Sequence, residues 1–272
     1  MRQDVLNLEP TIVETFEGKT SLEETIFTAD GQPTANYSGE SYVGYDWGVI
    51  KASQVRVEDN KMILSMDKRS TPKIFKGSPD KERWWDVGWA RTRGKVEFAN
   101  GAVEVRSRGA MHPGFWVGEW TRMVNGALDG EIDFKEMFNR PGDSPKPGAL
   151  QEDADGKLHN RYKTTVHFNY ANKVSVGEFS PITPAKLDTE FHTYGFLKTD
   201  EEIIFYFERE EVFRVTRKGR EAAWDAAFPK GEKMYLLECI QAGSEYYGQP
   251  PASNPDHLEY EIDQVTVWNF DN

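Results

Sequence analysis

The chain has 272 residues, a formal net charge of −12 and a pI near 5.0. The sequence has no basic stripe that could displace counterions from phosphates, so its composition argues against a nucleic-acid partner. The acidic balance also argues against simple electrostatic attraction to a strongly anionic polysaccharide, although net charge does not describe a cleft. No stretch approaches transmembrane length, and the first ten residues lack the apolar core of a signal peptide, so we expect no membrane partner.

The length and the aromatic content suit one all-β domain. A chain of this size can bury a sizeable core, and we expect a single domain over residues 1–272 that acts as a monomer. Aromatic residues make up 13% of the chain, which suits a β-sandwich core and supplies flat faces for stacking. Cys239 is the only cysteine, so no intrachain disulfide can form, and its apolar neighbours predict a buried core thiol.

The N-terminal third reads as short strands and turns. Residues 55–57 and 62–66 flank the turn-forming pair Asp59-Asn60 and predict a β-hairpin. Before it, Tyr42, Tyr45 and Trp47 lie among glycines and a serine, where they could form a cleft wall or cover one end of the core.

A tryptophan cluster precedes two further strand-like segments, residues 94–98 and 101–106. The pair Asn100-Gly101 between these segments predicts a two-residue hairpin turn. Charged residues flank Trp85 and Trp89, which makes both candidates for platforms on which a sugar ring stacks, with burial in the core as the alternative.

Residues 130–138 read Gly-Glu-Ile-Asp-Phe-Lys-Glu-Met-Phe. As a β-strand, this stretch turns Glu131 and Asp133 to one face and Ile132 and Phe134 to the other. In a regular strand Glu136 would join the apolar face, where an unpaired carboxylate is costly. One extra residue in a β-bulge returns Glu136 to the face of the other two acids, so we expect a bulge.

Three carboxylates on one strand face would share a small volume. Their mutual repulsion holds at least one proton near neutral pH, which can supply a general acid and an ionised nucleophile from the same residue type. If Glu131 and Glu136 lean inward, their carboxyl groups can approach the roughly 5 Å typical of retaining glycosidases. The alternative is a charged edge strand that is defended against pairing.

The rest of the chain continues the β pattern. Proline and glycine begin a long loop at residues 139–156, which we expect to border the site. Residues 164–168 predict a strand that carries His167, and residues 202–208 a buried strand followed by a turn at 210–211. Residues 221–228 predict a helix that ends before Pro229. The predicted class is therefore all-β, with two antiparallel sheets packed face to face as a jelly roll.

The stretch Glu-Ile-Asp-Phe-Lys-Glu resembles the E-x-D-x-x-E signature of glycoside hydrolase family 16, in the bulged form of its laminarinase, agarase and carrageenase branches. Further resemblances lie in the family's order across most of residues 40–270. They are residues 94–98, 101–106, Pro113-Gly114-Phe115-Trp116, Phe191-His192-Thr193-Tyr194, Met234-Tyr235-Leu236-Leu237 and 261–268.

This resemblance implies an endo-acting retaining hydrolase of internal β-1,3 or β-1,4 linkages in a glucan or galactan, with a concave substrate cleft. Glu131 would be the nucleophile, Asp133 its hydrogen-bonded neighbour and Glu136 the acid/base. Trp116 and His167 match family positions beside the scissile bond, although His167 could equally be a structural imidazole. A carbohydrate-binding jelly roll without catalysis is the alternative function.

Three further expectations follow from the resemblance. Relatives that act on β-1,3-glucan commonly have a Trp where this chain has His112, which puts laminarin specificity in doubt. No cofactor is required for catalysis, but some relatives hold a structural Ca²⁺, for which Asp263 and Glu17 are the candidate ligands here. Family members usually act outside the cell, so an extracellular or periplasmic location is expected.

Overall fold

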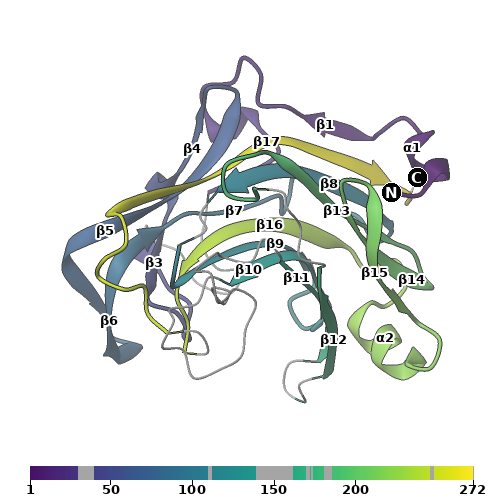
Figure 1. Ribbon diagram of the computed structural model, residues 1–272. Coiled ribbons are helices and arrows are strands. Elements are labelled where there is room, and N and C mark those ends of the chain that lie inside the picture. Colours follow the sequence, from purple (N-terminus) through teal and green to yellow (C-terminus); the bar gives the residue numbers. More distant parts are fainter. Residues whose placement is uncertain are drawn as a thin grey trace.

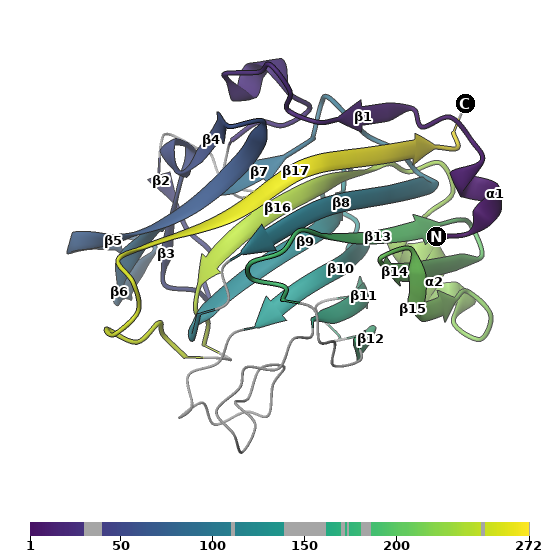
Figure 2. The same cartoon turned by 45° about the horizontal axis from the view of Figure 1, so that its top comes forward.

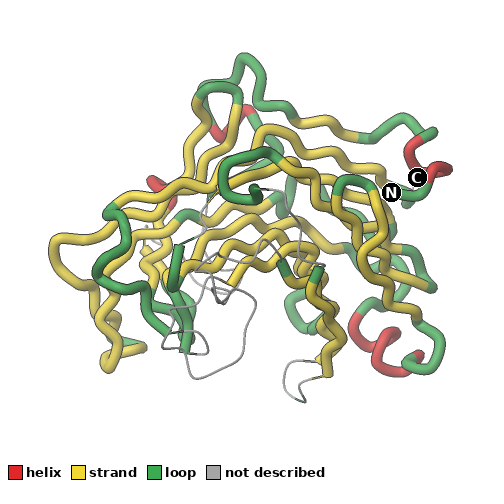
Figure 3. Tube along the Cα trace, in the orientation of Figure 1, coloured by secondary structure: helices red, strands yellow, loops and turns green. Residues whose placement is uncertain are grey.

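The computed structural model describes residues 1–29, 40–109, 112–138, 162–169, 172, 174–180, 186–245 and 248–271. Within them the chain forms two β-sheets packed face to face, with the few helical turns at the periphery (Figures 1 and 3). The predicted all-β jelly-roll class is confirmed.

One sheet has eleven strands in the order β15-β14-β13-β8-β17-β5-β6-β3-β2, with β1 added on β17 and β4 on β5. Its strands are β1 (Ile12–Glu14), β2 (Glu40–Ser41), β3 (Gly48–Lys51), β4 (Val55–Glu58), β5 (Lys61–Phe75), β6 (Ser78–Val87), β8 (Gly101–Gly109), β13 (His192–Lys198), β14 (Glu202–Phe207), β15 (Glu210–Thr216) and β17 (His257–Asn269). All its pairings are antiparallel except that of β3 with β6.

The other sheet has six antiparallel strands in the order β12-β11-β10-β9-β16-β7 (Figure 2). They are β7 (Trp89–Arg91), β9 (Phe115–Met123), β10 (Glu131–Phe138), β11 (Lys163–Asn169), β12 (Val174–Phe179) and β16 (Met234–Ala242). The helical segments are α1 (Gln3–Leu6), η1 (Leu22–Glu24), η2 (Ala52–Gln54) and α2 (Glu221–Ala227).

The core lies between the two sheets and follows the alternation of the strands. Ile132 and Phe134 of β10 are fully buried, and the ring of Phe134 lies 5.2 Å from that of Phe196 in β13. Strand β16 is buried along its whole length, so both faces of the six-stranded sheet are covered there. Because side chains alternate along a strand, Glu131 and Asp133 lie on the face of β10 opposite Ile132, away from the core.

Two local predictions are confirmed. Asp59 and Asn60 join β4 to β5 and have φ angles of 51° and 57°. Positive φ at both positions is what the favoured two-residue hairpin turn requires. The helix predicted at residues 221–228 is α2, and Trp224 on it is buried against Phe168 and Phe228.

Two other predictions are wrong. Residues 94–98 form no strand, and β8 pairs with β13 and β17. Gly101 is instead required by close packing, because a Cβ there would lie 2.4 Å from the carbonyl oxygen of Trp268. The turn before β15 lies at Glu208 and Arg209, with φ angles of 48° and 67°, one pair earlier than predicted.

Within the described part of the chain, none of the helices has the length and apolar character needed to cross a membrane.

The core contains an acid that lacks a hydrogen-bond partner. Glu238 of β16 lies opposite Glu119 of β9, and both its carboxylate oxygens are buried without a partner among the described residues. Burial, and then the charge of Glu119, raises the pKa of Glu238 well above its ordinary value. Burial therefore favours the neutral form of Glu238 in the folded protein.

A Glu238→Gln variant should gain stability over the wild type as the pH rises. The unfolded carboxyl loses its proton above about pH 4.3, whereas the folded carboxyl keeps it to higher pH. The native state then binds more protons, so the free energy of unfolding of the wild type falls with rising pH, and glutamine removes this fall. Thermal melts should show similar stability at about pH 4 and a gain of about 1–3 kcal/mol at about pH 8.

The matched control is Glu23→Gln, which changes an exposed acid of η1. It should leave the pH dependence of the melt unchanged. A Glu238→Gln gain that is the same at both pH values would contradict the neutral assignment.

Candidate active site

The β-bulge predicted for β10 is confirmed. The register of β10 shifts between Asp133 and Lys135 against β9, and between Asp133 and Glu136 against β11. As a result Phe134 and Lys135 both point into the core, where each is fully buried. Glu136 returns to the face of Glu131 and Asp133, and the three acids are 4–8% exposed.

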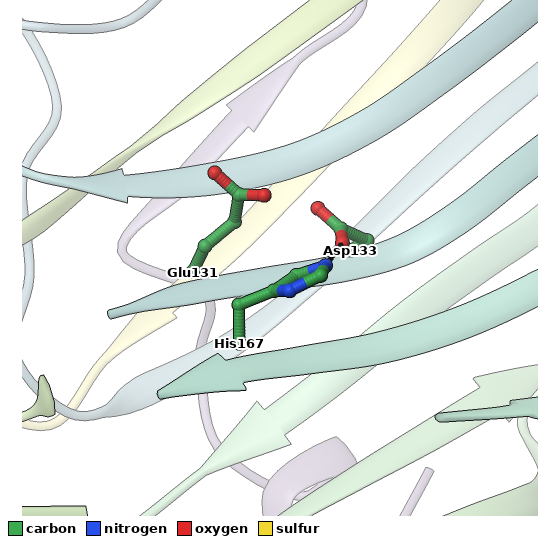
Figure 4. A group of neighbouring side chains, drawn as sticks. All are labelled: Glu131, Asp133 and His167. Carbon is green, nitrogen blue, oxygen red and sulfur yellow. Dashed lines mark ion pairs between the residues drawn. The ribbon is translucent and has the colours of Figure 1, made fainter. Parts of the chain in front are cut away.

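The neighbouring strands place polar partners directly opposite these acids. Glu131 lies opposite His167 of β11, and Asp133 lies opposite Thr165. His167 Nε2 is 3.0 Å from Asp133 Oδ2, and Asp133 also shares a side-chain hydrogen bond with Glu131. Figure 4 shows Glu131 and Asp133 from β10 and His167 from β11 gathered on one side of the sheet. The group is therefore a connected network.

Glu131 has a positive charge close by. Arg122 of β9 lies opposite it, with Nη1 3.8 Å from Glu131 Oε2. A guanidinium at this distance stabilises negative charge on the carboxylate, as a nucleophile needs.

Glu136 has the opposite character. The Thr165 hydroxyl donates to its Oε2 over 3.1 Å. Burial, and then the charge of Asp133, raises the pKa of Glu136 well above its ordinary value, and Lys163 and His167 only partly oppose this. Burial also raises the pKa of Asp133 to about 7, although its hydrogen bond with Glu131 acts to lower that pKa. The protonated form of Glu136 is therefore favoured, as a general acid requires.

The same network could hold a metal ion. One ligand atom from each of Glu131, Asp133 and His167 lies within 4.8 Å of the other two, the one such group found among the described residues. The ion pair of Asp133 with His167 and its hydrogen bond with Glu131 account for these atoms without a metal. We therefore interpret the group as a proton-sharing network.

Trp116 lies on the same side of the sheet as the acids. It shares its face of β9 with Trp120 and Arg122, is half-buried, and packs against Tyr45 with ring centroids 6.0 Å apart. This position suits the predicted substrate-binding role of Trp116, which stays a prediction, as does that of His167.

Trp85 and Trp89 are not available to a sugar ring, which corrects the prediction for both. Trp85 is 4% exposed and packs edge-on against Phe115, and Trp89 is 2% exposed and packs edge-on against Trp120. A stacking platform needs an open ring face, which neither offers.

The sequence prediction missed several residues beside the acids. Trp120 lies opposite Asp133, and Lys163 lies opposite Glu136. Tyr45, named in the sequence analysis as a possible cleft wall, also lies near the acids, because burial and then the charges of Asp46 and Glu131 raise the pKa of its hydroxyl. The alternation of β9, which puts Trp120 and Arg122 in phase with Trp116, could have revealed two of them.

Two other predictions, for Cys239 and for residues 139–156, have different outcomes. Cys239 is fully buried, as expected, and burial raises the pKa of its thiol well above its usual value. Residues 139–156, expected to border the cleft, lie outside the described residues.

The calcium prediction is neither confirmed nor excluded. Arg106 pairs with one carboxylate oxygen of Asp263, which opposes cation binding, but the other oxygen is buried without a hydrogen-bond partner among the described residues. Glu17 is exposed. One free oxygen suits a cation, so calcium at Asp263 and Glu17 stays a prediction.

Comparison with known proteins identifies the family. The sequence matches Glycosyl hydrolases family 16 over residues 42–264. The chain belongs to this family.

Relatives of known activity agree with this membership. An endo-1,3-1,4-β-glycanase, ExsH, of Rhizobium meliloti is 27% identical over 172 residues, which cover 63% of this chain and 30% of the relative. A β-glucanase of Acetivibrio thermocellus is 26% identical over 235 residues, 84% of this chain and 59% of the relative. The chain thus spans less than two thirds of either curated relative.

Solved structures agree on the fold. The catalytic domain of an endo-1,3-β-glucanase (laminarinase) from Thermotoga petrophila superposes with a TM-score of 0.74 at 15% identity, over 97% of this chain and 98% of that one. An endo-β-1,3-glucanase from Pyrococcus furiosus gives 0.72 at 17% identity, over 96% and 94%.

An Asp133→Asn variant should shift the pH dependence of hydrolysis. The charge of Asp133 raises the pKa of Glu136, so its removal lowers that pKa and Glu136 loses its proton at lower pH. The alkaline limb of the kcat/KM profile should therefore move to lower pH, with a reduced maximum. An Asp225→Asn control on the exposed face of α2 should leave the limb in place, and an unmoved limb in Asp133→Asn would refute the coupling.

Proposed function

We propose that this chain is an endo-acting retaining glycoside hydrolase that cleaves internal β-1,3 or β-1,4 linkages of a neutral or mildly anionic glucan or galactan. The observation that carries the proposal is the gathering of Glu131, Asp133 and Glu136 on one face of a bulged strand. Burial raises the pKa of Asp133 to about 7, and burial together with the charge of Asp133 raises the pKa of Glu136, which supports the acid role of Glu136.

The proposed reaction has two steps. A carboxylate oxygen of Glu131 attacks the anomeric carbon, the bond to the leaving oxygen breaks, and that oxygen takes the proton of Glu136. Glu136, now ionised, removes a proton from water, whose oxygen bonds to the anomeric carbon as the bond to Glu131 breaks. Asp133 keeps Glu131 oriented through their hydrogen bond and is itself held by His167, whose Nε2 lies 3.0 Å from Asp133 Oδ2.

The substrate class rests on the relatives. Those reported above are described as an endo-1,3-1,4-β-glycanase, a β-glucanase and endo-1,3-β-glucanases, which supports a β-glucan as the first substrate to test. Galactans stay within the proposal because His112 stands where β-1,3-glucan-specific relatives commonly have a Trp. We further infer a polysaccharide partner, action outside the cell as a monomer, and no cofactor in the chemistry.

A reducing-end assay on a panel of β-glucans and galactans tests the activity. Products should begin as mixed oligosaccharides, because an endo-acting site cuts chains internally. Monosaccharide as the sole early product would contradict the endo mode. Binding without any new reducing ends on the whole panel would favour the non-catalytic carbohydrate-binding alternative.

Azide rescue tests the residue roles. In Glu131→Ala the nucleophile is gone, so azide should attack from the vacated face and give an α-glycosyl azide. In Glu136→Ala an activated substrate can still form the covalent intermediate, which azide should intercept to give a β-azide. Asp133→Asn should be slow without either rescue.

Proton NMR of the products gives the anomeric configuration. The wild type should first release the β-configured sugar. An α-configured first product, or azides of the opposite hands in the two alanine variants, would refute the assignment.

A further inference from the structure

Lys135 is a buried lysine at the bulge that aligns the acids. Its side chain has no exposed surface, and it points away from the face that carries the three acids, into the space between the two sheets. The bulge that turns Glu136 toward the cleft is the same feature that turns Lys135 into the core. The two side chains can therefore exchange faces only together.

The ammonium group of Lys135 is fully satisfied. Its Nζ donates to Ser107 Oγ over 2.9 Å, to the Tyr260 hydroxyl over 2.9 Å and to Glu119 Oε1 over 3.3 Å. Three donors thus meet three acceptors. The Nζ also lies 3.9 Å from the centre of the Tyr194 ring.

These contacts tie the bulge to the opposite sheet. Ser107, Tyr260 and Tyr194 belong to β8, β17 and β13 of the eleven-stranded sheet, whereas Glu119 lies opposite Lys135 on the adjacent β9. Ser107 and Tyr260 also donate to Glu119 Oε1, so the network closes on itself. A one-residue slip of β10 would break the three bonds that Lys135 donates.

We propose that Lys135, held by Glu119, is a positioning residue that fixes the bulge and so aims Glu136 at the leaving oxygen. The proposal rests on the proposed hydrolytic function. Glu136 follows Lys135 directly, whereas Glu131 lies before the bulge, where its pairing with β9 and β11 is regular. Loss of the network should therefore disturb the acid more than the nucleophile.

The test uses two substrates that differ in their need for the acid. Glycosyl transfer to Glu131 requires protonation by Glu136 when the leaving group is a sugar, but not when it is 2,4-dinitrophenolate. The probes are the polysaccharide that the wild type cuts best and the 2,4-dinitrophenyl β-glycoside of the oligosaccharide that it releases. The quantity compared is kcat/KM, which reports the first irreversible step.

In Lys135→Met, kcat/KM on the polysaccharide should fall about tenfold or more, since small misplacements of catalytic groups are costly. On the dinitrophenyl glycoside it should change less than about twofold. A purely structural role would lower both equally. Equal losses on both substrates, or no loss on either, would overturn the proposal.

Two further variants separate positioning from stability. Glu119→Gln/Lys135→Met removes both buried charges, so it should melt closer to the wild type than Lys135→Met does, yet keep the selective loss on the polysaccharide. Lys198→Met removes another buried lysine, at the end of β13 in the eleven-stranded sheet. Its Nζ donates to the Ala99 carbonyl and to Asn100 Oδ1. This variant should lower stability without any selective loss.

The outcomes also distinguish this proposal from the function itself. A wild type that releases no new reducing ends from any polysaccharide of the panel refutes the hydrolase. An active wild type with a selective loss in Lys198→Met, or with none in the double variant, refutes only the role of Lys135.

Discussion

The site depends on a one-residue shift of register in β10. Side chains on a strand alternate with a period of two, so every residue after a bulge changes face. Without the shift, Glu136 would lie in the core and Lys135 on the face of Glu131 and Asp133. With it, the acidic face gains its third carboxylate, and the core receives a cation for which Glu119 is already in place.

Burial on both faces of the six-stranded sheet gives the acids their different roles. A carboxyl group away from water resists ionisation, and a charged neighbour increases that resistance. Glu136 meets both conditions, because it is buried and lies in the field of Asp133. Glu131 has Arg122 on the adjacent strand instead. Two residues of the same type thus have different electrostatic surroundings, as the proposed roles of acid and nucleophile require.

The sequence predicted what local pattern controls. Alternation and the cost of burying an acid were enough to place the bulge and the three carboxylates, whereas the family resemblance pointed to His167. The tryptophans failed because their charged neighbours were read as a sign of exposure. Arg83, next to Trp84, is itself fully buried, with its guanidinium 4.4 Å from the centre of the Tyr42 ring. Charge in a sequence does not report exposure when a partner from a distant strand covers it.

The Asn100-Gly101 prediction failed for a related reason. A glycine can serve a turn or a close approach of two backbones, and only the tertiary structure distinguishes the two uses. At Gly101 the neighbour is the carbonyl oxygen of Trp268, more than 150 residues away in sequence. Likewise, no short-range pattern links Lys135 with Ser107 and Tyr260.

The core network also has the right net charge for the site above it. A buried ammonium without a counterion beneath Glu136 would favour the ionised carboxylate and oppose the acid role. Glu119 neutralises Lys135, and Glu238 on the next strand is kept neutral by burial and by the charge of Glu119. The three residues together carry no net charge. The bulge can therefore be held by an ion pair while the proton on Glu136 stays available for transfer.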